Sequence, residues 1–284
     1  MKTITRIGEI QKLSDSIRLN SRTIGFVPTM GSLHKGHLAL INKSKEVCDI
    51  TIVSIFVNPI QFAPSEDFNK YPRNIENDKK ILIKEGVDYL FAPESEQIYQ
   101  KHFQTYVNVE DISKKLEGAS RPAHFRGVTT IVNILFNCIN PHYAFFGQKD
   151  AQQASVIRQM VRDLKLNVNI VVCPIIRESD GLAMSSRNVF LTKAERKEAL
   201  VLYKSLQMAK KIINEGERNV NAIRLELKSM INAVKSSNPD YVEIVKSDSF
   251  EFVGEIKQGS EYYILIACKF GKTRLIDNEL IKII

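Results

Sequence analysis

The sequence contains no apolar run long enough to cross a membrane as a helix. Its longest apolar stretches, such as "NIVVCPII" and "YYILIAC", have about the length of a β-strand, whereas a membrane-spanning helix needs about 20 apolar residues. The opening residues, "MKTITRIGEIQKL", also lack the apolar core and the small-residue cleavage site of a secretory signal. We therefore expect a cytoplasmic protein without a membrane partner.

Cysteine is scarce, and the four cysteines lie far apart in the chain. Cys48, Cys138, Cys173 and Cys268 form no C-x-x-C pair, so the sequence indicates neither a zinc knuckle nor a disulfide framework. We expect four reduced thiols without a catalytic role.

The basic residues form no arginine-rich arm or tract, although the net charge is +8. Such an excess suits either nucleic acid or an anionic small ligand. Because the basic residues are dispersed, we favour a phosphate-binding cleft and predict no nucleic-acid partner. A basic RNA- or DNA-binding module is the alternative, and binding that weakens steeply with salt would support it.

Strand-like and helix-like segments alternate through the first two thirds of the chain. The strand-like segments are "TIGFVPT", "ITIVSIFVN", "VDYLFAP", "HYAFFG" and "NVNIVVCPII", and the helix-like segments are 35–47, 74–85, 128–138 and 151–163. Strands this uniformly apolar are typical of a parallel sheet that helices cover on both faces. The pattern predicts an α/β fold with a Rossmann-like doubly wound parallel sheet.

The pattern changes after Arg177. Two long charged segments, 193–214 and 220–235, have helical spacing, and they precede the strand-like runs "YVEIVK", "EYYILIACKF" and "TRLIDNELIKI". We interpret these runs as antiparallel strands joined by the turns "KQGS" and "FGKT". We predict a first domain over residues 1–177 and a smaller C-terminal α+β domain over residues 178–284.

The stretch "PTMGSLHKGH" joins the first of these strands to a helix. Gly31 permits a tight turn, and the start of the following helix directs backbone N–H groups and a positive dipole end toward a bound phosphate. His34 and His37 are three residues apart, so both lie on one face of the first helical turn. Imidazoles at this place can donate hydrogen bonds to phosphate oxygens.

The H-x-G-H pattern of His34 to His37 resembles the adenylylation signature of the nucleotidyltransferase superfamily. Members of that superfamily carry a second motif late in the chain, and "AMSSRN" occupies that place here. Ser185 and Ser186 offer hydroxyl groups, and Arg187 offers a planar cation that suits a departing pyrophosphate.

Two further stretches place polar residues directly after predicted strands. "FVNPIQF" contributes Asn58 and Gln61, whose neutral amides can hold hydroxyl and carboxylate groups. "FFGQKDAQQ" contributes Lys149 as a point charge for phosphate and Asp150 as a ligand for ribose or magnesium. We expect these groups to share one cleft at the carboxyl edge of the sheet.

These motifs together resemble the pantothenate synthetase, or pantoate-β-alanine ligase, family. The resemblance rests on "PTMGSLHKGH", "FVNPIQF", "DFNKYPR", "EGASRPAHFRGV", "FFGQKDAQQ", "GLAMSSRN" and "TRLIDN", which extend over nearly the whole chain. Ser32, Lys35 and Ser179 stand where the family more often has alanine, glutamate and proline. These departures leave the reactive side chains in place.

The resemblance implies that ATP, pantoate and β-alanine are converted to pantothenate, AMP and pyrophosphate through a pantoyl adenylate, with Mg2+ on the phosphates. It assigns chemical roles to His34, His37, Lys149, Ser186 and Arg187, with His37 as proton donor. It assigns ATP binding to Met30, Gly31, Ser32, Leu33, His34, Lys35, Gly36, His37, Gly147, Gln148, Lys149, Asp150, Ile176, Met184, Ser185, Ser186 and Arg187.

The same resemblance implies that Gln61 and Gln153 bind pantoate and that Gln61 also contacts β-alanine. Two further candidates are our own: Asn58 as a substrate ligand and Asp150 as a metal ligand. The resemblance further implies a homodimer. We expect ATP and pantoate to bind the first domain and the second domain to act as a lid, because a solvent-exposed acyl adenylate hydrolyses. Another nucleotidyltransferase or a truncated aminoacyl-tRNA synthetase is the enzymatic alternative, although about 107 residues after Arg177 leave little room for a tRNA-reading domain.

Overall fold

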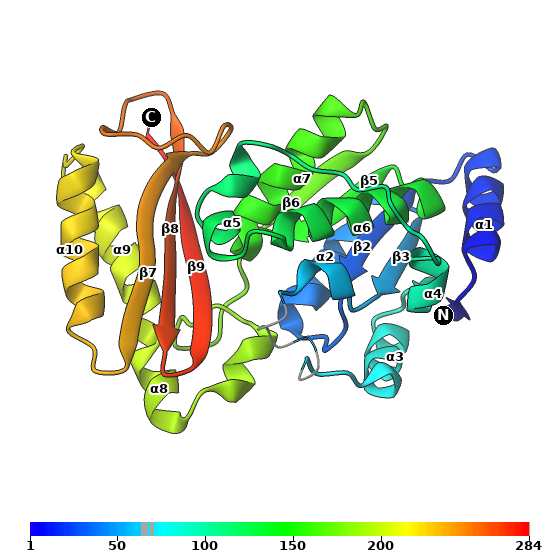
Figure 1. Ribbon diagram of the computed structural model, residues 1–284, viewed down its shortest axis with the longest axis horizontal. Coiled ribbons are helices and arrows are strands. Elements are labelled where there is room, and N and C mark those ends of the chain that lie inside the picture. Colours follow the sequence, from blue (N-terminus) through cyan, green and yellow to red (C-terminus); the bar gives the residue numbers. More distant parts are fainter. Residues whose placement is uncertain (64–67, 69–70, 284) are drawn as a thin grey trace. The chain divides into compact units, whose positions relative to one another are not determined.

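The computed structural model describes residues 1–63, 68 and 71–283, so residues 67, 69 and 70 of the "DFNKYPR" motif lie outside the described residues. The chain divides into two compact units (Figure 1). The first comprises Met1–Gly147 and Gln152–Pro174, and the second comprises Gln148–Ala151 and the residues from Ile175 onward. The short segment Gln148–Ala151 therefore belongs to the second unit although it interrupts the first unit in sequence.

The first unit contains a six-stranded sheet in the order β1-β4-β3-β2-β5-β6. Its neighbouring strands all run parallel. This confirms the predicted Rossmann-like parallel sheet. The strands are β1 (Lys2–Ile4), β2 (Ile24–Thr29), β3 (Ile50–Ile55), β4 (Tyr89–Phe91), β5 (Tyr143–Gly147) and β6 (Asn169–Cys173).

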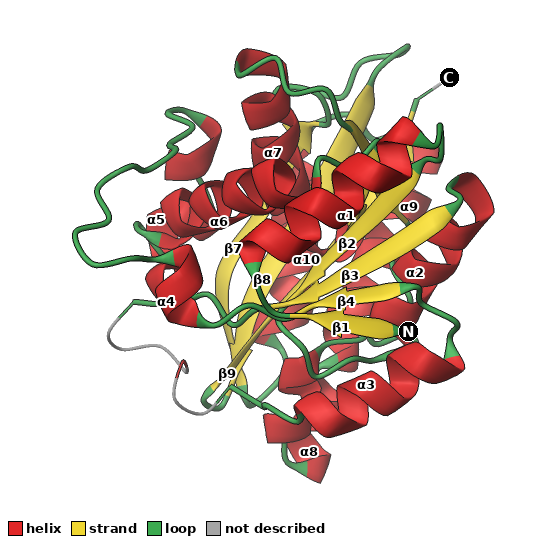
Figure 2. Ribbon diagram, turned by 90° about the vertical axis from the view of Figure 1, so that its right-hand side faces the viewer, coloured by secondary structure: helices red, strands yellow, loops and turns green. Residues whose placement is uncertain are grey.

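Helices cover both faces of this sheet, with α1, α6 and α7 on one face and α2 and α3 on the other (Figure 2). Because of this double cover, nearly every residue of β2 and β3 is buried, which explains why these strands show no alternation of apolar and polar residues. The helices of this unit are α1 (Ile7–Leu19), α2 (Lys35–Val47), α3 (Ile75–Lys84), α4 (Ser95–Ile98), α5 (Glu117–Ser120), α6 (His124–Ile139) and α7 (Ala151–Asp163).

The structure contains elements that the sequence did not predict, among them the short helices α4 and α5, and it divides one predicted helix. β1 and α1 are additional elements: β1 has three residues, and α1 buries only Ile10, Ser14 and Ile17, so neither produces a strong apolar period. The expected single helix 193–214 is two helices, α8 (Lys193–Glu198) and α9 (Leu200–Asn214), which meet at Ala199. Neither glycine nor proline marks this junction, so the sequence carries no breaker signal there.

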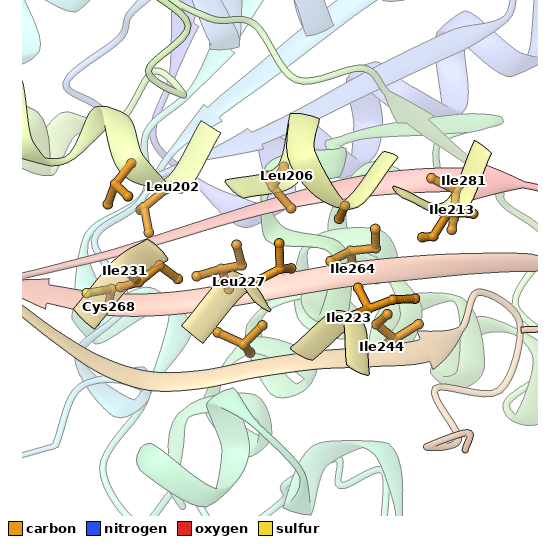
Figure 3. Packing of buried hydrophobic residues seen from close by; sticks show 14 of the residues in the cluster. Leu202, Leu206, Ile213, Ile223, Leu227, Ile231, Ile244, Ile264, Cys268 and Ile281 are labelled. Atoms are coloured by element: carbon orange, nitrogen blue, oxygen red, sulfur yellow. The ribbon is translucent and has the colours of Figure 1, made fainter. Parts of the chain in front are cut away.

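The second unit packs helices against a three-stranded antiparallel sheet in the order β7-β8-β9. Its strands are β7 (Ser237–Lys246), β8 (Glu261–Phe270) and β9 (Thr273–Lys282), and α10 spans Val220–Asn232. Ile223, Leu227 and Ile231 recur every fourth residue on α10 and face Ile264 and other apolar side chains of the sheet (Figure 3). This spacing buries one stripe of the helix and leaves the opposite side to solvent.

No helix among the described residues has the length and apolar character needed to cross a membrane.

The α10 stripe allows a matched stability test. Leu227 is fully buried, whereas Leu225 on the same helix is 69% exposed. We expect Leu227→Ala to lower the free energy of unfolding by about 3 kcal/mol, because it removes buried methyl groups and leaves a cavity. Leu225→Ala should change it by less than about 0.5 kcal/mol. Urea unfolding followed by circular dichroism measures both, and equal effects would contradict the packing described here.

Candidate active site

The carboxyl ends of β2 and β3 place two of the predicted site segments at one edge of the first unit's sheet. Thr29 pairs with Ile55 at the ends of these parallel strands, so the residues that follow both strands emerge together. Gln61, in the 3-10 turn Pro59–Gln61, donates a hydrogen bond from Nε2 to the Met30 sulfur over 2.9 Å. The structure thus brings together residues expected to bind ATP and pantoate.

His34 and His37 lie together at the start of α2, as their spacing predicted. Their ring centroids are 4.1 Å apart. His34 is the N-cap residue, and its Nδ1 accepts a hydrogen bond from the Gly36 N–H (3.1 Å). His37 Nδ1 accepts one from the His34 N–H (3.3 Å). Because both Nδ1 atoms act as acceptors, the ring proton of each neutral imidazole lies on Nε2, which is then the donor atom.

The backbone donors of this turn are largely used within the protein, contrary to the expectation that they are free for a ligand. Asp78 of α3 accepts hydrogen bonds from the N–H groups of Ser32 and Leu33, both at 2.9 Å. The Gly31 N–H donates to Thr29 Oγ1 (3.2 Å). The chemistry of the turn therefore depends on its side chains, and Asp78 fixes their position.

Two glycines of the motif are explained by close contacts. Gly31 has a φ of +81°, and an added Cβ would lie 2.9 Å from an Asp78 carboxylate oxygen. A Cβ on Gly36 would lie 2.8 Å from the His34 ring, so the space beside Gly36 is filled by the imidazole and not reserved for a ligand.

Sequence analysis did not identify Asp78 as a site residue. Its position on α3 could have indicated a structural role, because it shares the buried face of that helix with Leu82, four residues later. A carboxylate on a buried helical face needs a specific partner, because burial of an unpaired charge is costly.

Asn58 lies behind Gln61 and is 1% exposed. Its Nδ2 donates to Gln61 Oε1 (3.1 Å) and to the Gly127 carbonyl (3.0 Å), and its Oδ1 accepts from the Tyr99 hydroxyl (2.7 Å). Burial raises the pKa of the Tyr99 phenol, so this hydroxyl stays a donor. The hydrogen bonds favour a role for Asn58 in orienting Gln61, and direct substrate binding by Asn58 stays a prediction.

His124 supports the same turn from α6. It lies 3.0 Å from the Gln61 carbonyl through Nδ1 and 3.2 Å from an Arg121 nitrogen through Nε2. A Cβ on Gly127 would lie 2.6 Å from Gln61 Cα, so α6 and the turn approach each other closely. Tyr99 did not stand out in the sequence, and His124 lies within the "EGASRPAHFRGV" motif but was given no role there, because both act through contacts with residues distant in the chain.

The two glutamines at the start of α7 differ in their surroundings. Gln152 is buried and ties down an irregular loop, since it accepts from the Glu117 N–H (3.0 Å) and donates to the carbonyls of Ile112 (2.8 Å) and Lys115 (2.7 Å). Gln153, the predicted pantoate ligand, is half-buried.

In the second unit, a short antiparallel pairing positions the Ser-Ser-Arg segment. Arg177 pairs with Ala183, and the Met184 N–H donates to the Ile176 carbonyl (3.0 Å). Two predicted ATP contacts, Ile176 and Met184, are therefore adjacent. Ser185 then caps the 3-10 turn Ser186–Phe190 by accepting from the Arg187 N–H (3.2 Å).

Lys149 and Ser185 line the same small cavity of the second unit, together with Asp277 of β9. The cavity measures about 10 Å³, which is room for about one water molecule. The cavity lies where two predicted phosphate-binding segments approach each other, and it is too small to be the nucleotide site. The Lys149 ammonium lies 3.5 Å from the half-exposed Asp150 carboxylate.

A family model described as pantoate-beta-alanine ligase matches residues 2–280. The chain belongs to this family. Proteins named pantothenate synthetase from Caldicellulosiruptor bescii and Acetivibrio thermocellus are each 50% identical to it, over 99% and 100% of both chains respectively. These matches confirm the predicted family and the predicted class of enzyme.

Solved structures of pantothenate synthetases agree. One from Thermus thermophilus is 41% identical, with a TM-score of 0.91 over 98% of this chain and 99% of its own. The pantoate-β-alanine ligase from Francisella tularensis, described as complexed with beta-gamma ATP and beta-alanine, is 34% identical, with a TM-score of 0.78 over 99% of this chain and 97% of its own.

Burial keeps the thiols of this pantoate-β-alanine ligase family member protonated. It raises the pKa of Cys48, Cys138 and Cys268 to about 11 and also raises that of Cys173. Thiols of this kind are weak nucleophiles at neutral pH, and the adenylate chemistry of a ligase needs no covalent enzyme intermediate.

The Asp78 anchor yields a test that is independent of activity. Asp78→Asn keeps the size of the side chain but removes a charged acceptor of two N–H groups, and its amide nitrogen faces one of those donors. We expect a loss of about 2 kcal/mol in the free energy of unfolding, the scale of hydrogen bonds to a charged group. Glu76→Gln, on the exposed side of the same helix, is the control: it removes only an exposed ion pair to Lys79 and should change the free energy of unfolding by no more than about 0.5 kcal/mol. Unaltered stability of Asp78→Asn would show that the turn is held by other contacts.

Proposed function

We propose that this chain forms pantothenate in two steps, with ATP cleaved to AMP and pyrophosphate and pantoyl adenylate as the bound intermediate. The observation that carries the proposal is the histidine pair at the start of α2, in which both rings accept main-chain hydrogen bonds at Nδ1 and hold a donor proton at Nε2. Family membership and the ATP and β-alanine named for the Francisella tularensis enzyme support it.

In the first step, a carboxylate oxygen of pantoate attacks the α-phosphorus of ATP. A bond from that oxygen to phosphorus forms, the bond to the bridging oxygen breaks, and pyrophosphate leaves. His34 and His37 donate hydrogen bonds to the phosphates, and Lys149, Ser186 and Arg187 offset the negative charge of the leaving group. The ATP-binding segments are Met30 to His37, Gly147 to Asp150, Ile176 and Met184 to Arg187.

In the second step, the amine of β-alanine attacks the activated carbonyl carbon. A carbon–nitrogen bond forms, the carbon–oxygen bond to AMP breaks, and the proton that the amine loses passes to the departing phosphate of AMP. Gln61 and Gln153 hold pantoate, Gln61 also contacts β-alanine, and His37 is the proton donor. Asn58 contributes by fixing the Gln61 amide, in keeping with its hydrogen bonds.

Mg2+ is part of this proposal, with Asp150 as its protein ligand. No group of three histidine, cysteine, aspartate or glutamate side chains in residues 1–63, 68 and 71–283 could hold a metal ion. A single half-exposed carboxylate such as Asp150 suits an ion that takes its other ligands from phosphates and water. When bound, the ion neutralises phosphate charge.

We further propose a cytoplasmic homodimer in which the second unit acts as a lid. The dimer rests on the family resemblance, and the lid on the lability of an acyl adenylate, which hydrolyses in contact with water.

The decisive experiment is isotope exchange between pyrophosphate and ATP. We expect exchange that depends on pantoate and does not need β-alanine. Repeating the assay with similar hydroxy acids defines the acid that is activated. Exchange that is independent of pantoate, or that prefers another acid, would favour a different nucleotidyltransferase.

Two alanine variants test the roles of the phosphate-contacting residues. His37→Ala and Arg187→Ala should each slow pantoate-dependent exchange by about a hundredfold or more, the scale for loss of one transition-state donor. Near-normal exchange in both variants would count against the assigned roles. Lys12→Ala, on the outer helix α1, is a suitable surface control and should exchange like the unaltered enzyme.

A further inference from the structure

Strand β9 carries two consecutive, almost fully buried polar residues to which the proposed reaction gives no role. Asp277 is 2% exposed and Asn278 is 1% exposed. Both belong to the "TRLIDN" motif. Because buried polar groups are costly unless they are hydrogen-bonded, their partners indicate what they hold in place.

Both polar atoms of the Asn278 side chain form hydrogen bonds with one short turn. Its Nδ2 donates to the carbonyls of Gln148 (2.9 Å) and Lys149 (3.0 Å), and its Oδ1 accepts from Gln148 Nε2 (3.2 Å). These residues form the 3-10 turn Gln148–Asp150. Turns of this kind have weak internal hydrogen bonds, so Asn278 fixes the main chain from which the Lys149 side chain extends.

Asp277 holds the other phosphate-binding segment through Arg177. The guanidinium donates to both carboxylate oxygens, at 2.7 and 3.0 Å. It also donates to the Gly181 carbonyl (3.0 Å) and stacks on the Tyr203 ring at 4.6 Å. Burial raises the pKa of Asp277, while the Arg177 charge opposes this rise. Arg177 begins the pairing that leads to Met184 and Ser185.

The two residues are linked to each other as well. The Asn278 N–H donates to Asp277 Oδ1 (2.8 Å). Asp277 lines the small cavity that Lys149 and Ser185 also line. Strand β9 therefore connects the segment of Lys149 with the segment of Ser185, although these two residues are 36 positions apart in the chain.

We propose that Asp277 and Asn278 are positioning residues for adenylation, which act by holding Lys149 and the Ser185–Arg187 segment at a fixed spacing. The inference rests on the proposed function of these two segments. Lysine has a long flexible stem, so its ammonium is placed only as accurately as the main chain that carries it. A displacement of about 1 Å can cost about a hundredfold in rate.

Asn278→Asp and Asn278→Ala test the proposal. The carboxylate of Asn278→Asp keeps the shape but cannot donate to the two carbonyls. We expect both variants to slow pantoate-dependent exchange by at least about tenfold. The second half-reaction, from synthetic pantoyl adenylate and β-alanine, should stay within about threefold, since pyrophosphate has already left. Equal loss in both half-reactions would show a general structural role and overturn the proposal.

Arg224→Ala is the matched control, because it removes a half-buried ion pair to Glu243 elsewhere in the same unit. It should leave both half-reactions unchanged. A double-mutant cycle with Lys149→Ala adds a second criterion. If Asn278 acts through Lys149, Asn278→Ala should cost less than about threefold in the Lys149→Ala background. Additive effects would contradict that route.

Hydrogen exchange of the main chain separates failure of this inference from failure of the proposed function. Residues 148–151 should exchange faster in Asn278→Ala than in the unaltered protein or in Arg224→Ala. Unchanged exchange there overturns the positioning role whatever reaction the protein catalyses. Absence of pantoate-dependent activity in the unaltered protein would instead refute the proposed function, and the hydrogen-exchange comparison would still decide the role of Asn278.

Discussion

Parallel hydrogen bonding of β2 with both β3 and β5 is the constraint on which the first unit's functional edge depends. Strands that run in one direction end on one side, so the segments after Thr29 and Ile55 leave the sheet together. Main-chain groups lose their sheet partners at such ends and need others. Asp78 and Thr29 supply such partners with buried side chains, and Asn58 holds the side chain of Gln61 in the turn that follows β3.

The second unit achieves comparable order with a different device. Its antiparallel sheet buries an apolar face against α9 and α10, while one strand, β9, carries a buried carboxylate and a buried amide at consecutive positions. Consecutive residues of a strand point to opposite faces. Asp277 and Asn278 can therefore bind separate segments. Asp277 binds Arg177, which pairs with Ala183, and Asn278 binds the turn that carries Lys149.

Local signals and motif spacing account for what could be predicted from the sequence. The helices 35–47 and 151–163 agree with α2 and α7 because each follows an apolar strand and begins at a polar turn. The histidine pair was predictable from its spacing, and the family from several motifs together. Asp78, Tyr99 and His124 were not, because their roles arise from contacts 46, 41 and 63 residues away in the chain. Asp78 and Tyr99 lie outside the recognised motifs, and the place of His124 inside one of them does not show which residue it contacts.

The Nδ1 hydrogen bonds of His34 and His37 couple the tautomer of these rings to the start of α2. A neutral ring that already holds its proton on Nε2 can gain a second proton only at Nδ1. At that atom each ring accepts a main-chain N–H, from Gly36 in one case and from His34 in the other. A hydrogen at Nδ1 would therefore remove a helix cap, so the same hydrogen bond that caps α2 also sets which ring nitrogen can donate to a ligand.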